Sequence, residues 1–432
     1  MYYRRLGNSS NCERISVLQC VYRRIQFECS LVFTIVKSGL ITFVNMERFS
    51  FVNGLWKEYS EFRNDQLSGR YITFSHIEPE LRKLDPIIRV EEIGSSASGV
   101  PIHAVSLGKG PIRIFGWSQM HGNEATTTRA LFDILNLFSR KNKIPEIAEI
   151  LDRCTLRFIP MLNPDGAERY TRENINGIDL NRDASELTQV ESRVLMKCFQ
   201  DFNPNFCFNL HDQRTIFSAG KLGNPATVSF LAPAMDESRS LNGTRIKAMK
   251  TIVAMNSQLQ KYIPGQVGRF DDAFNINCSG DRFQTLGVPT ILFEAGHFPG
   301  DYSRDETRKY IAMALLTGIY AISSGEMERE ELEFYNDIPE NQKDYCDILL
   351  KNVMRNGTLV EVSIQYVEKL ANGKIVFDPL VQRIQKELPI SGHRIMDCKG
   401  QEVLSLSGDP LYENDVVAGI LLNRENISFK IE

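Results

Sequence analysis

Short apolar runs alternate with helix-like stretches from about residue 88 onward. The runs 112–117, 156–162, 206–210 and 288–293 each have the length and hydrophobicity of a buried strand. Between the first two, the apolar positions of residues 125–138 recur at helical spacing, and Arg308 to Ile322 predicts a closing helix. Strands separated by helices predict an α/β fold with a mainly parallel sheet and helices on both faces.

The start of the chain has a different pattern. Residues 1–45 contain six Lys and Arg against two acids, and their apolar run from Ser30 to Val44 is interrupted by Lys37. The run is too short and too interrupted for a spanning helix, and its charges are not ordered as in a signal peptide. We interpret residues 1–45 as a disordered, targeting or spuriously included extension, and residues 46–92 as a helical lead-in.

Beyond a catalytic-domain candidate at 93–324, the pattern changes again. Residues 325–343 are rich in acids and are interpreted as a linker or exposed helix. After it, Thr358 to Ile364 alternates between apolar and polar residues, and the hairpin-type dipeptides Asn356-Gly357 and Asn372-Gly373 flank this region. These signals predict a small β-rich C-terminal domain over 344–432.

Composition narrows the functional classes. The chain has 432 residues, of which 42% are hydrophobic and 24% charged, which is typical of a soluble globular protein with one large and one smaller domain. Its net charge of −4 gives no reason to expect nucleic acid as a partner. Nine cysteines without a C-x-x-C pair argue against a disulfide framework or thiolate metal site, so we expect a reducing, cytoplasmic location.

Metal-ligating residue types fall where the predicted strands end, which is where an open α/β sheet builds its site. His121 and Glu124 are three residues apart in a loop that enters a helix, so they can point to one place, and His211 follows the strand 206–210. Two His and one Glu with an open position form a catalytic zinc arrangement. An H-x-x-E pair alone is weak, because it is common by chance. The complete set predicts one Zn²⁺ per chain.

Four further side chains agree with hydrolytic chemistry. Glu294 follows an apolar strand and is suited to accept a proton from an activated water. Arg172 lies in a loop and can stabilise an oxyanion. The pair Asn181-Arg182 can hold a carboxylate through a fork of donors. Each alone has a structural explanation, as a helix cap or surface ion pair, but together they favour a site.

From about Ile93 to Ile322, the ordered series H-x-x-E, N-P-D-G, R, N-R, H, E resembles the carboxypeptidase A-like zinc metallopeptidase family. The resemblance implies an α/β/α sandwich around a mixed sheet. It also implies a metallocarboxypeptidase that hydrolyses the C-terminal amide bond of peptides with a free carboxylate, using a zinc-activated water. The corresponding residues would be zinc ligands His121, Glu124 and His211, oxyanion-binding Arg172, carboxylate-binding Asn181 and Arg182, and general base Glu294.

The sequence departs from that family in ways that concern the substrate. The stretch from Gly268 to Gly287, where the family places a substrate-contacting Tyr, contains Phe270 and Phe274 but no Tyr. His211 is followed by Asp212-Gln213-Arg214, which predicts a charged rim. The specificity pocket is expected to involve residues 271–284, and peptide, muropeptide and isopeptide substrates all remain open.

Two other functions stay open from the residues. His-Gly-Asn-Glu and Asp-Leu-Asn-Arg also resemble the zinc-dependent N-acyl-amino-acid deacylases, such as aspartoacylase and succinylglutamate desuccinylase, whereas Asn163-Pro-Asp-Gly166 favours peptidases. An inactive module that binds peptide carboxylates is the third hypothesis. His297, three residues after Glu294, is a candidate for supporting the site. The sequence gives no firm membrane signal and no oligomeric state.

Overall fold

The computed structural model describes residues 48–140 and 142–431. The chain divides into two units at Gly54, and all the sheets lie in the unit from Leu55 to Glu432. The predictions for residues 1–45 fall outside the described residues. Among the residues described, no helix has the length and apolar character needed to cross a membrane, and all six cysteines are free.

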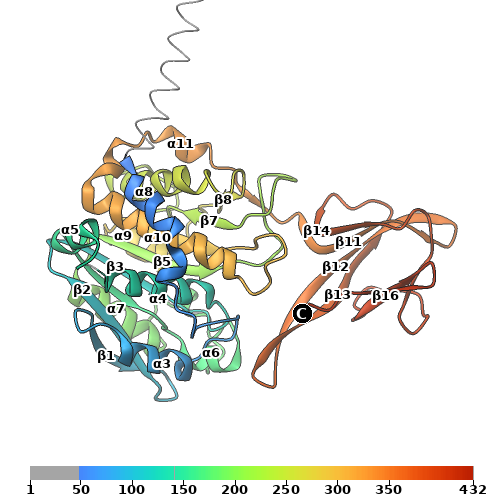
Figure 1. Ribbon diagram of the computed structural model, residues 1–432, viewed down its shortest axis with the longest axis horizontal. Coiled ribbons are helices and arrows are strands. Elements are labelled where there is room, and N and C mark those ends of the chain that lie inside the picture. Colours follow the sequence, from blue (N-terminus) through green and yellow to red (C-terminus); the bar gives the residue numbers. More distant parts are fainter. Residues whose placement is uncertain (1–47, 141, 432) are drawn as a thin grey trace, which may run out of the picture. The chain divides into compact units, whose positions relative to one another are not determined.

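An eight-stranded mixed sheet forms the centre of the larger unit (Figure 1). Its strands are β1 (Arg89–Ser95), β2 (Pro101–Gly108), β3 (Ile112–Ser118), β4 (Cys154–Ile159), β5 (Phe206–Asp212), β7 (Val228–Leu231), β8 (Val267–Arg269) and β9 (Thr290–Ala295). They are ordered β1-β2-β4-β3-β5-β9-β7-β8. Four of the seven neighbouring pairs are parallel, including those that join β4, β3, β5 and β9. The predicted mainly parallel mixed sheet is therefore confirmed.

Helices cover both faces of this sheet. They are α4 (Thr126–Phe138), α5 (Pro145–Arg153), α6 (Pro164–Arg169), α7 (Val190–Phe202), α8 (Gly243–Leu259), α9 (Ser279–Thr285) and α10 (Asp305–Ser324). Neighbouring residues of β5 show the layering, because successive strand side chains point to opposite faces. Cys207 lies in a core cluster with Leu195 of α7 and Phe283 of α9. Phe208 lies next to Gly318 of α10, so α8 and α10 cover the opposite face.

The central strands agree with the sequence predictions, whereas the outer strands on both sides of the sheet were not predicted. Runs 112–117 and 206–210 are β3 and β5, run 288–293 is β9, and both predicted helices are present as α4 and α10. Run 156–162 overlaps β4, which ends earlier than predicted, at Ile159. The helix α6 then begins at Pro164. Strands β1, β2, β7 and β8 were not predicted; the pairs β1-β2, β2-β4 and β7-β9 are antiparallel, and β7-β8 is parallel.

The segments on either side of the catalytic-domain candidate, residues 93–324 (the catalytic body below), contain helices and a short strand. The lead-in contains α2 (Ser50–Lys57), η1 (Tyr59–Glu61) and α3 (Phe74–Lys83), while the sheet itself already begins with β1. The acidic segment contains η3 (Glu326–Arg329), α11 (Glu333–Asn336) and β10 (Asn341–Gln342), which pairs with β6 (Ser218–Ala219). Tyr335 is buried, and its hydroxyl accepts a 3.1 Å hydrogen bond from the backbone of Ala232. The segment therefore packs against the catalytic body and is not a solvated linker.

The C-terminal residues are β-rich, as predicted. One sheet has the order β13-β12-β11-β14, and a second contains β15, β16 and β17. Their bounds are β11 (Tyr345–Arg355), β12 (Thr358–Ala371), β13 (Lys374–Gln385), β14 (Ser391–Asp397), β15 (Val403–Ser405), β16 (Gly419–Leu422) and β17 (Glu425–Ser428). Asn356-Gly357 and Asn372-Gly373 join β11 to β12 and β12 to β13, with φ of 50° and 74°, and 51° and 72°. Both predicted hairpins are confirmed, because positive φ at both turn residues is the type I′ requirement.

A buried ion pair links the two long helices on one face of the sheet. Arg308 of α10 and Asp133 of α4 lie 2.5 Å apart, and both side chains are 0% exposed. The carboxylate of Asp133 also accepts hydrogen bonds from the Tyr59 hydroxyl at 2.6 Å and the Asn64 backbone at 2.7 Å. The guanidinium of Arg308 donates to the carbonyls of Asn64 and Leu67, both at 2.7 Å. This network fixes residues 59–67 to the catalytic body.

Arg308→Met should lower the free energy of unfolding by about 3–5 kcal/mol, because the charge of Asp133 would remain buried without its partner. Urea unfolding followed by circular dichroism measures the change. Lys197→Met is the matched control, since Lys197 and Asp201 form an exposed helical pair with side chains 72% and 65% exposed. A loss for Arg308→Met no larger than for this control would contradict the role assigned to the network.

The motif His121-Gly-Asn-Glu124 packs against the motif Asn163-Pro-Asp-Gly166. A Cβ on Gly122, in the loop after β3, would lie 1.9 Å from the backbone carbon of Gly166 in α6. A Cβ on Gly166 would lie 2.5 Å from Nδ2 of Asn163. The Asn163 side chain caps α6 by accepting from the Gly166 backbone at 2.9 Å and donates to the Met120 carbonyl at 3.1 Å. Both motifs therefore set the path of the loop that carries His121 and Glu124.

Gly122→Ala should destabilise the protein by about 1–3 kcal/mol or more, because backbone atoms must move to admit the methyl group. It should also weaken zinc binding, since the adjacent His121 would be displaced. Gly243→Ala is the control, because a Cβ there meets no atom within 4 Å. Urea unfolding and zinc titration compare the two variants; equal behaviour would show that the loop tolerates the methyl group.

Candidate metal centre

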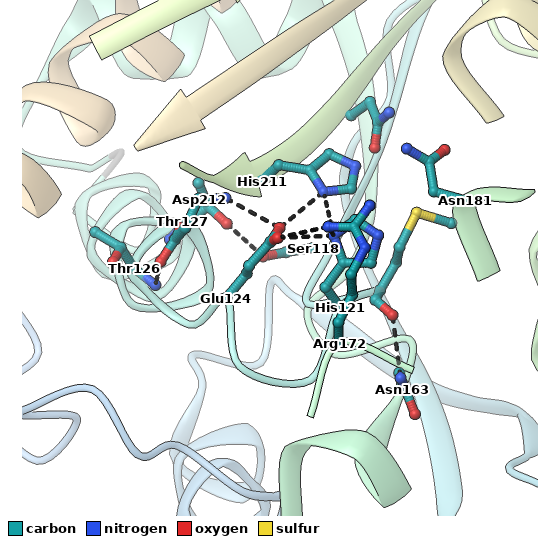
Figure 2. A network of polar contacts seen from close by, with 12 residues as sticks. Ser118, His121, Glu124, Thr126, Thr127, Asn163, Arg172, Asn181, His211 and Asp212 are labelled. Atoms are coloured by element: carbon teal, nitrogen blue, oxygen red, sulfur yellow. Dashed lines mark hydrogen bonds and ion pairs between the residues drawn. The ribbon is translucent and has the colours of Figure 1, made fainter. Parts of the chain in front are cut away.

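Three side chains predicted as metal ligands converge in the structure. His121 and Glu124 lie in the loop between β3 and α4, and His211 lies near the carboxyl end of β5. Their candidate ligand atoms all lie within 4.8 Å of one another. Nδ1 of His121 is 2.8 Å from one carboxylate oxygen of Glu124, and Nδ1 of His211 is 2.8 Å from the other. Figure 2 shows the two rings and the carboxylate facing one point.

The donor set fits a zinc ion. The two Nδ1 atoms are 3.1 Å apart, and zinc ligands at 2.0–2.1 Å in tetrahedral geometry are about 3.3 Å apart. Glu124 is 9% exposed and each His is 2% exposed, so few other groups can reach this point. Buried imidazoles packed nitrogen to nitrogen around one carboxylate are typical of a metal centre.

Burial and charge shift the pKa of each ligand. Burial opposes ionisation of Glu124, but the two neighbouring histidines outweigh it and hold its pKa well below the usual value. Burial also opposes protonation of His121, yet the charge of Glu124 and the hydrogen bonds that Asp179 and Glu124 accept from the ring raise its pKa. For His211 burial prevails, so its pKa is lowered. The protein alone therefore keeps an ionised carboxylate at the centre, as a cation site requires.

Two residues from the loop after α6 support His121. One carboxylate oxygen of Asp179 is 3.1 Å from Nε2 of His121, on the ring side away from Glu124. Its other oxygen accepts from Nε of Arg172 at 2.9 Å. A carboxylate on the second imidazole nitrogen fixes the tautomer and orientation of a metal-ligating His. Asp179 was missed from the sequence, although its place in Asp-Leu-Asn-Arg, two residues before Asn181, was a usable signal.

Arg172, the expected oxyanion-binding residue, lies next to two of the three candidate ligands. Its Nη1 is 3.2 Å from Nδ1 of His121 and 3.4 Å from a carboxylate oxygen of Glu124. The side chain is 41% exposed, so one edge of the guanidinium also faces solvent. A cation placed between the ligands and open solvent can contact a substrate oxygen.

Asn181 and Arg182 lie in the short helix η2 (Leu180–Arg182), directly after Asp179. The Asn181 side-chain oxygen accepts from the backbone and hydroxyl of Ser279, both at 2.9 Å. Arg182 is exposed, and its Nη1 donates to the Asn181 carbonyl at 2.7 Å and to Sγ of Cys278 at 3.1 Å. The pair thus follows Asp179 in the chain. Among the described residues, it makes no direct contact with the three ligands.

Glu294 lies at the carboxyl end of β9, in parallel register with His211. One of its carboxylate oxygens is buried without a hydrogen-bond partner. Burial, then the charges of Glu124 and Asp212, raise its pKa well above the usual value. Glu294 thus lies on the strand next to that of His211, with a buried carboxylate of raised pKa.

The predicted charged rim after His211 is wrong for two of its three residues. Asp212 and Gln213 are only 8% and 6% exposed, because β5 is a central strand that continues through Asp212. The Asp212 backbone donates to Glu124 at 3.1 Å. Its carboxylate accepts from the backbones of Thr126 and Thr127 at the start of α4, at 2.9 and 3.4 Å (Figure 2). Burial raises the pKa of Asp212, and only Arg214 reaches the surface.

Other candidates lie elsewhere. The ring of His297 packs against those of Tyr302 and His393, with centroids 4.7 and 4.3 Å away, and makes no contact with the three ligands. Tyr262, the Tyr nearest upstream of the expected loop, packs on Trp56 at 4.5 Å. In the expected specificity segment, Asp281 is buried, and this burial raises its pKa to about 6.

Comparisons with known proteins agree with this geometry. Residues 79–219 match the family model described as zinc carboxypeptidase, a region that contains all three ligands. The chain is 26% identical to carboxypeptidase SOL1 of Arabidopsis thaliana over 167 residues, covering 34% of each chain. It is 27% identical to carboxypeptidase E of Caenorhabditis elegans over 158 residues, covering 30% of this chain and 33% of the relative.

The chain is also similar to solved structures of carboxypeptidases. A metallo-carboxypeptidase from Pseudomonas aeruginosa is 14% identical with a TM-score of 0.46, covering 59% of this chain and 68% of its own. Carboxypeptidase A from Helicoverpa armigera is 14% identical with a TM-score of 0.45, covering 64% and 81%. The chain spans about a third of the length of the curated relatives it matches. Residues 79–219, and with them the three candidate ligands, are thus similar to the zinc carboxypeptidase family.

Proposed function

We propose that this protein is a zinc-dependent metallocarboxypeptidase that removes the C-terminal residue of peptides or peptide-like substrates. The observation that carries the proposal is the convergence of His121, Glu124 and His211 on one buried point, with Arg172 aimed at that point and Glu294 on the adjoining strand. A metal site, an oxyanion-binding cation and a base together make a hydrolytic centre.

The three ligands would hold the ion, and Asp179 would keep His121 oriented toward it. When bound, zinc supplies a Lewis acid that polarises a carbonyl and lowers the pKa of water to about 7. Arg172 would donate to the substrate oxygen on which negative charge develops, from its half-exposed position beside the ligands.

Glu294 would act as general base and then return the proton to the leaving amine. Its burial and its acidic neighbours raise its pKa, which makes the carboxylate a stronger proton acceptor than an exposed one. The unpartnered buried oxygen is free to accept a proton.

Asn181 and Arg182 would hold the free carboxylate of the substrate. The Asn181 oxygen already accepts from Ser279, which leaves its amide N–H groups as the available donors next to the exposed Arg182. Such donors beside the metal would select substrates that end in a carboxylate.

The deacylase hypothesis uses the same carboxylate contact and differs in the acyl group. Relative rates on acyl-amino acids and on peptides with the same C-terminal residue separate the two. The match to the zinc carboxypeptidase model favours the peptidase.

Glu294→Gln should reduce turnover by about 10²–10⁴-fold, because the amide keeps the shape but cannot accept a proton. Zinc content should be unchanged, since Glu294 is not one of the three ligands. Steady-state kinetics and elemental analysis measure both, with the exposed Glu387→Gln as control. Near-normal turnover would assign the proton to another group.

Arg182→Ala should lower kcat/KM for free-acid peptides by roughly 30-fold or more, since losing one partner of a charge pair costs about 2–5 kcal/mol. Amidation of the substrate carboxylate should harm the wild-type enzyme to a similar degree. The two losses should not add, because both remove the same interaction. Equal cleavage of free-acid and amidated peptides by the wild type would refute the carboxypeptidase and deacylase hypotheses together.

A further inference from the structure

A cavity of about 260 Å³ lies beside the metal centre, and the C-terminal β-rich region forms one wall of it. On the catalytic side the cavity is lined by Asn123, Glu124 and the end of β5. The opposite wall comes from β12 and β13, including Gln365 and Phe377. Its volume is just below the range of about 300–1,000 Å³ typical of pockets for drug-sized ligands. It can therefore hold a small part of a substrate.

The cavity lies on the side of the ligands opposite the carboxylate-binding pair. It reaches Glu124 and Asp212, but Asp179, Asn181 and Arg182 do not line it. Figure 2 shows Asp212 on one side of the ligands and Asn181 on the other. If the substrate carboxylate binds Arg182, as proposed above, the cavity receives the part of the substrate upstream of the cleaved bond.

Buried hydrogen bonds hold the C-terminal wall in place. The carboxylate of Asp347 in β11 accepts from Tyr302 at 2.9 Å, Thr215 at 3.3 Å, the Tyr366 backbone at 2.8 Å and the Gln365 side chain. Tyr302 and Thr215 belong to the catalytic body, so these bonds cross between the two parts. The wall is therefore a fixed part of the cavity.

A second contact fixes the same wall from β12. Both terminal nitrogens of Arg70 pair with the carboxylate of Glu368, at 3.0 and 3.1 Å. The Tyr170 hydroxyl donates to the same carboxylate. This bidentate pair neutralises the two charges and leaves Nε of Arg70, which is buried, without a partner.

The lining carries two arginines and four carboxylates, namely Arg70, Arg214, Glu124, Asp212, Asp347 and Glu368, and the carboxylates all have partners. Asp347 is saturated by four donors, Glu368 is paired, and Asp212 is occupied by the start of α4. Arg214 is exposed and forms no ion pair with any residue that the structure describes. Arg214 is thus a cation of the lining whose charge is not already engaged by a partner in the described part of the chain. An anionic group in the cavity would meet Arg214.

We propose that this cavity is a binding site for a short acyl part of the substrate that carries a carboxylate, and that Arg214 selects that carboxylate. The site would prefer an acidic residue immediately upstream of the cleaved bond. It would admit little further chain before that residue. The preference deepens the proposed function and depends on it for the direction in which substrate binds.

The first test compares acetyl-Glu and acetyl-Gln dipeptides that share one C-terminal residue with a free carboxylate. The wild type should favour the Glu substrate in kcat/KM by on the order of tenfold, the low end for close charge pairs. Arg214→Ala should bring this ratio close to one, and Arg214→Glu should favour an acetyl-Lys substrate instead. Arg383→Ala removes an exposed arginine that does not line the cavity, and should keep the wild-type ratio.

The second test measures binding without catalysis. N-acetylglutamate should bind the zinc-loaded protein more tightly than N-acetylglutamine in titration calorimetry, and Arg214→Ala should remove the difference. If peptides are cleaved but Glu and Gln substrates react equally, the inference is overturned and the proposed function stands. If no free-acid peptide is cleaved, the proposed function fails, and calorimetry alone decides: an Arg214-dependent preference supports the site, and equal binding overturns it.

Discussion

The buried carboxylate of Glu124 is the group on which the arrangement of the site depends. Taking an ionised carboxylate out of water costs several kcal/mol unless it is paired and hydrogen-bonded. Here the partners are His121, His211 and the Asp212 backbone, which come from a loop after β3 and from the end of β5. Satisfying one charge thus brings separate segments together, and leaves two imidazole nitrogens facing the point where a cation can bind.

The supporting groups follow from that requirement. Asp212 can donate its backbone N–H to Glu124 because its own carboxylate is held by the first turn of α4. The loop between His121 and Glu124 can pass close to α6 only because Gly122 and Gly166 lack side chains. The helix dipole at the start of α4 favours the negative charge of Asp212. Metal ligation, helix capping and loop packing are therefore parts of one structure.

Sequence alone was sufficient for the features that depend on local composition. Central strands β3, β5 and β9 could be predicted because strands covered on both faces are continuously apolar. The edge strand β1, Arg-Val-Glu-Glu-Ile-Gly-Ser, is mostly polar because it is more exposed, and gave no such signal. The three ligands were found because their residue types follow strand ends. Asp179 was missed because its contact with His121 depends on the path of a loop, and the burial of Asp212 depends on its partners in α4.

Contacts between distant parts of the chain explain what no local pattern could predict. Arg70 and Glu368 are 298 positions apart, yet their bidentate pair and the four bonds to Asp347 fix the C-terminal strands next to the catalytic body. A buried ion pair adds little stability compared with apolar packing of similar volume, but a single displaced partner is costly. We infer that such pairs here determine geometry more than stability: they hold β12 and β13 at one distance from Glu124. The size and charge of the neighbouring cavity are set by that distance. The C-terminal region, which has no catalytic motif of its own, thereby limits what can reach the metal centre.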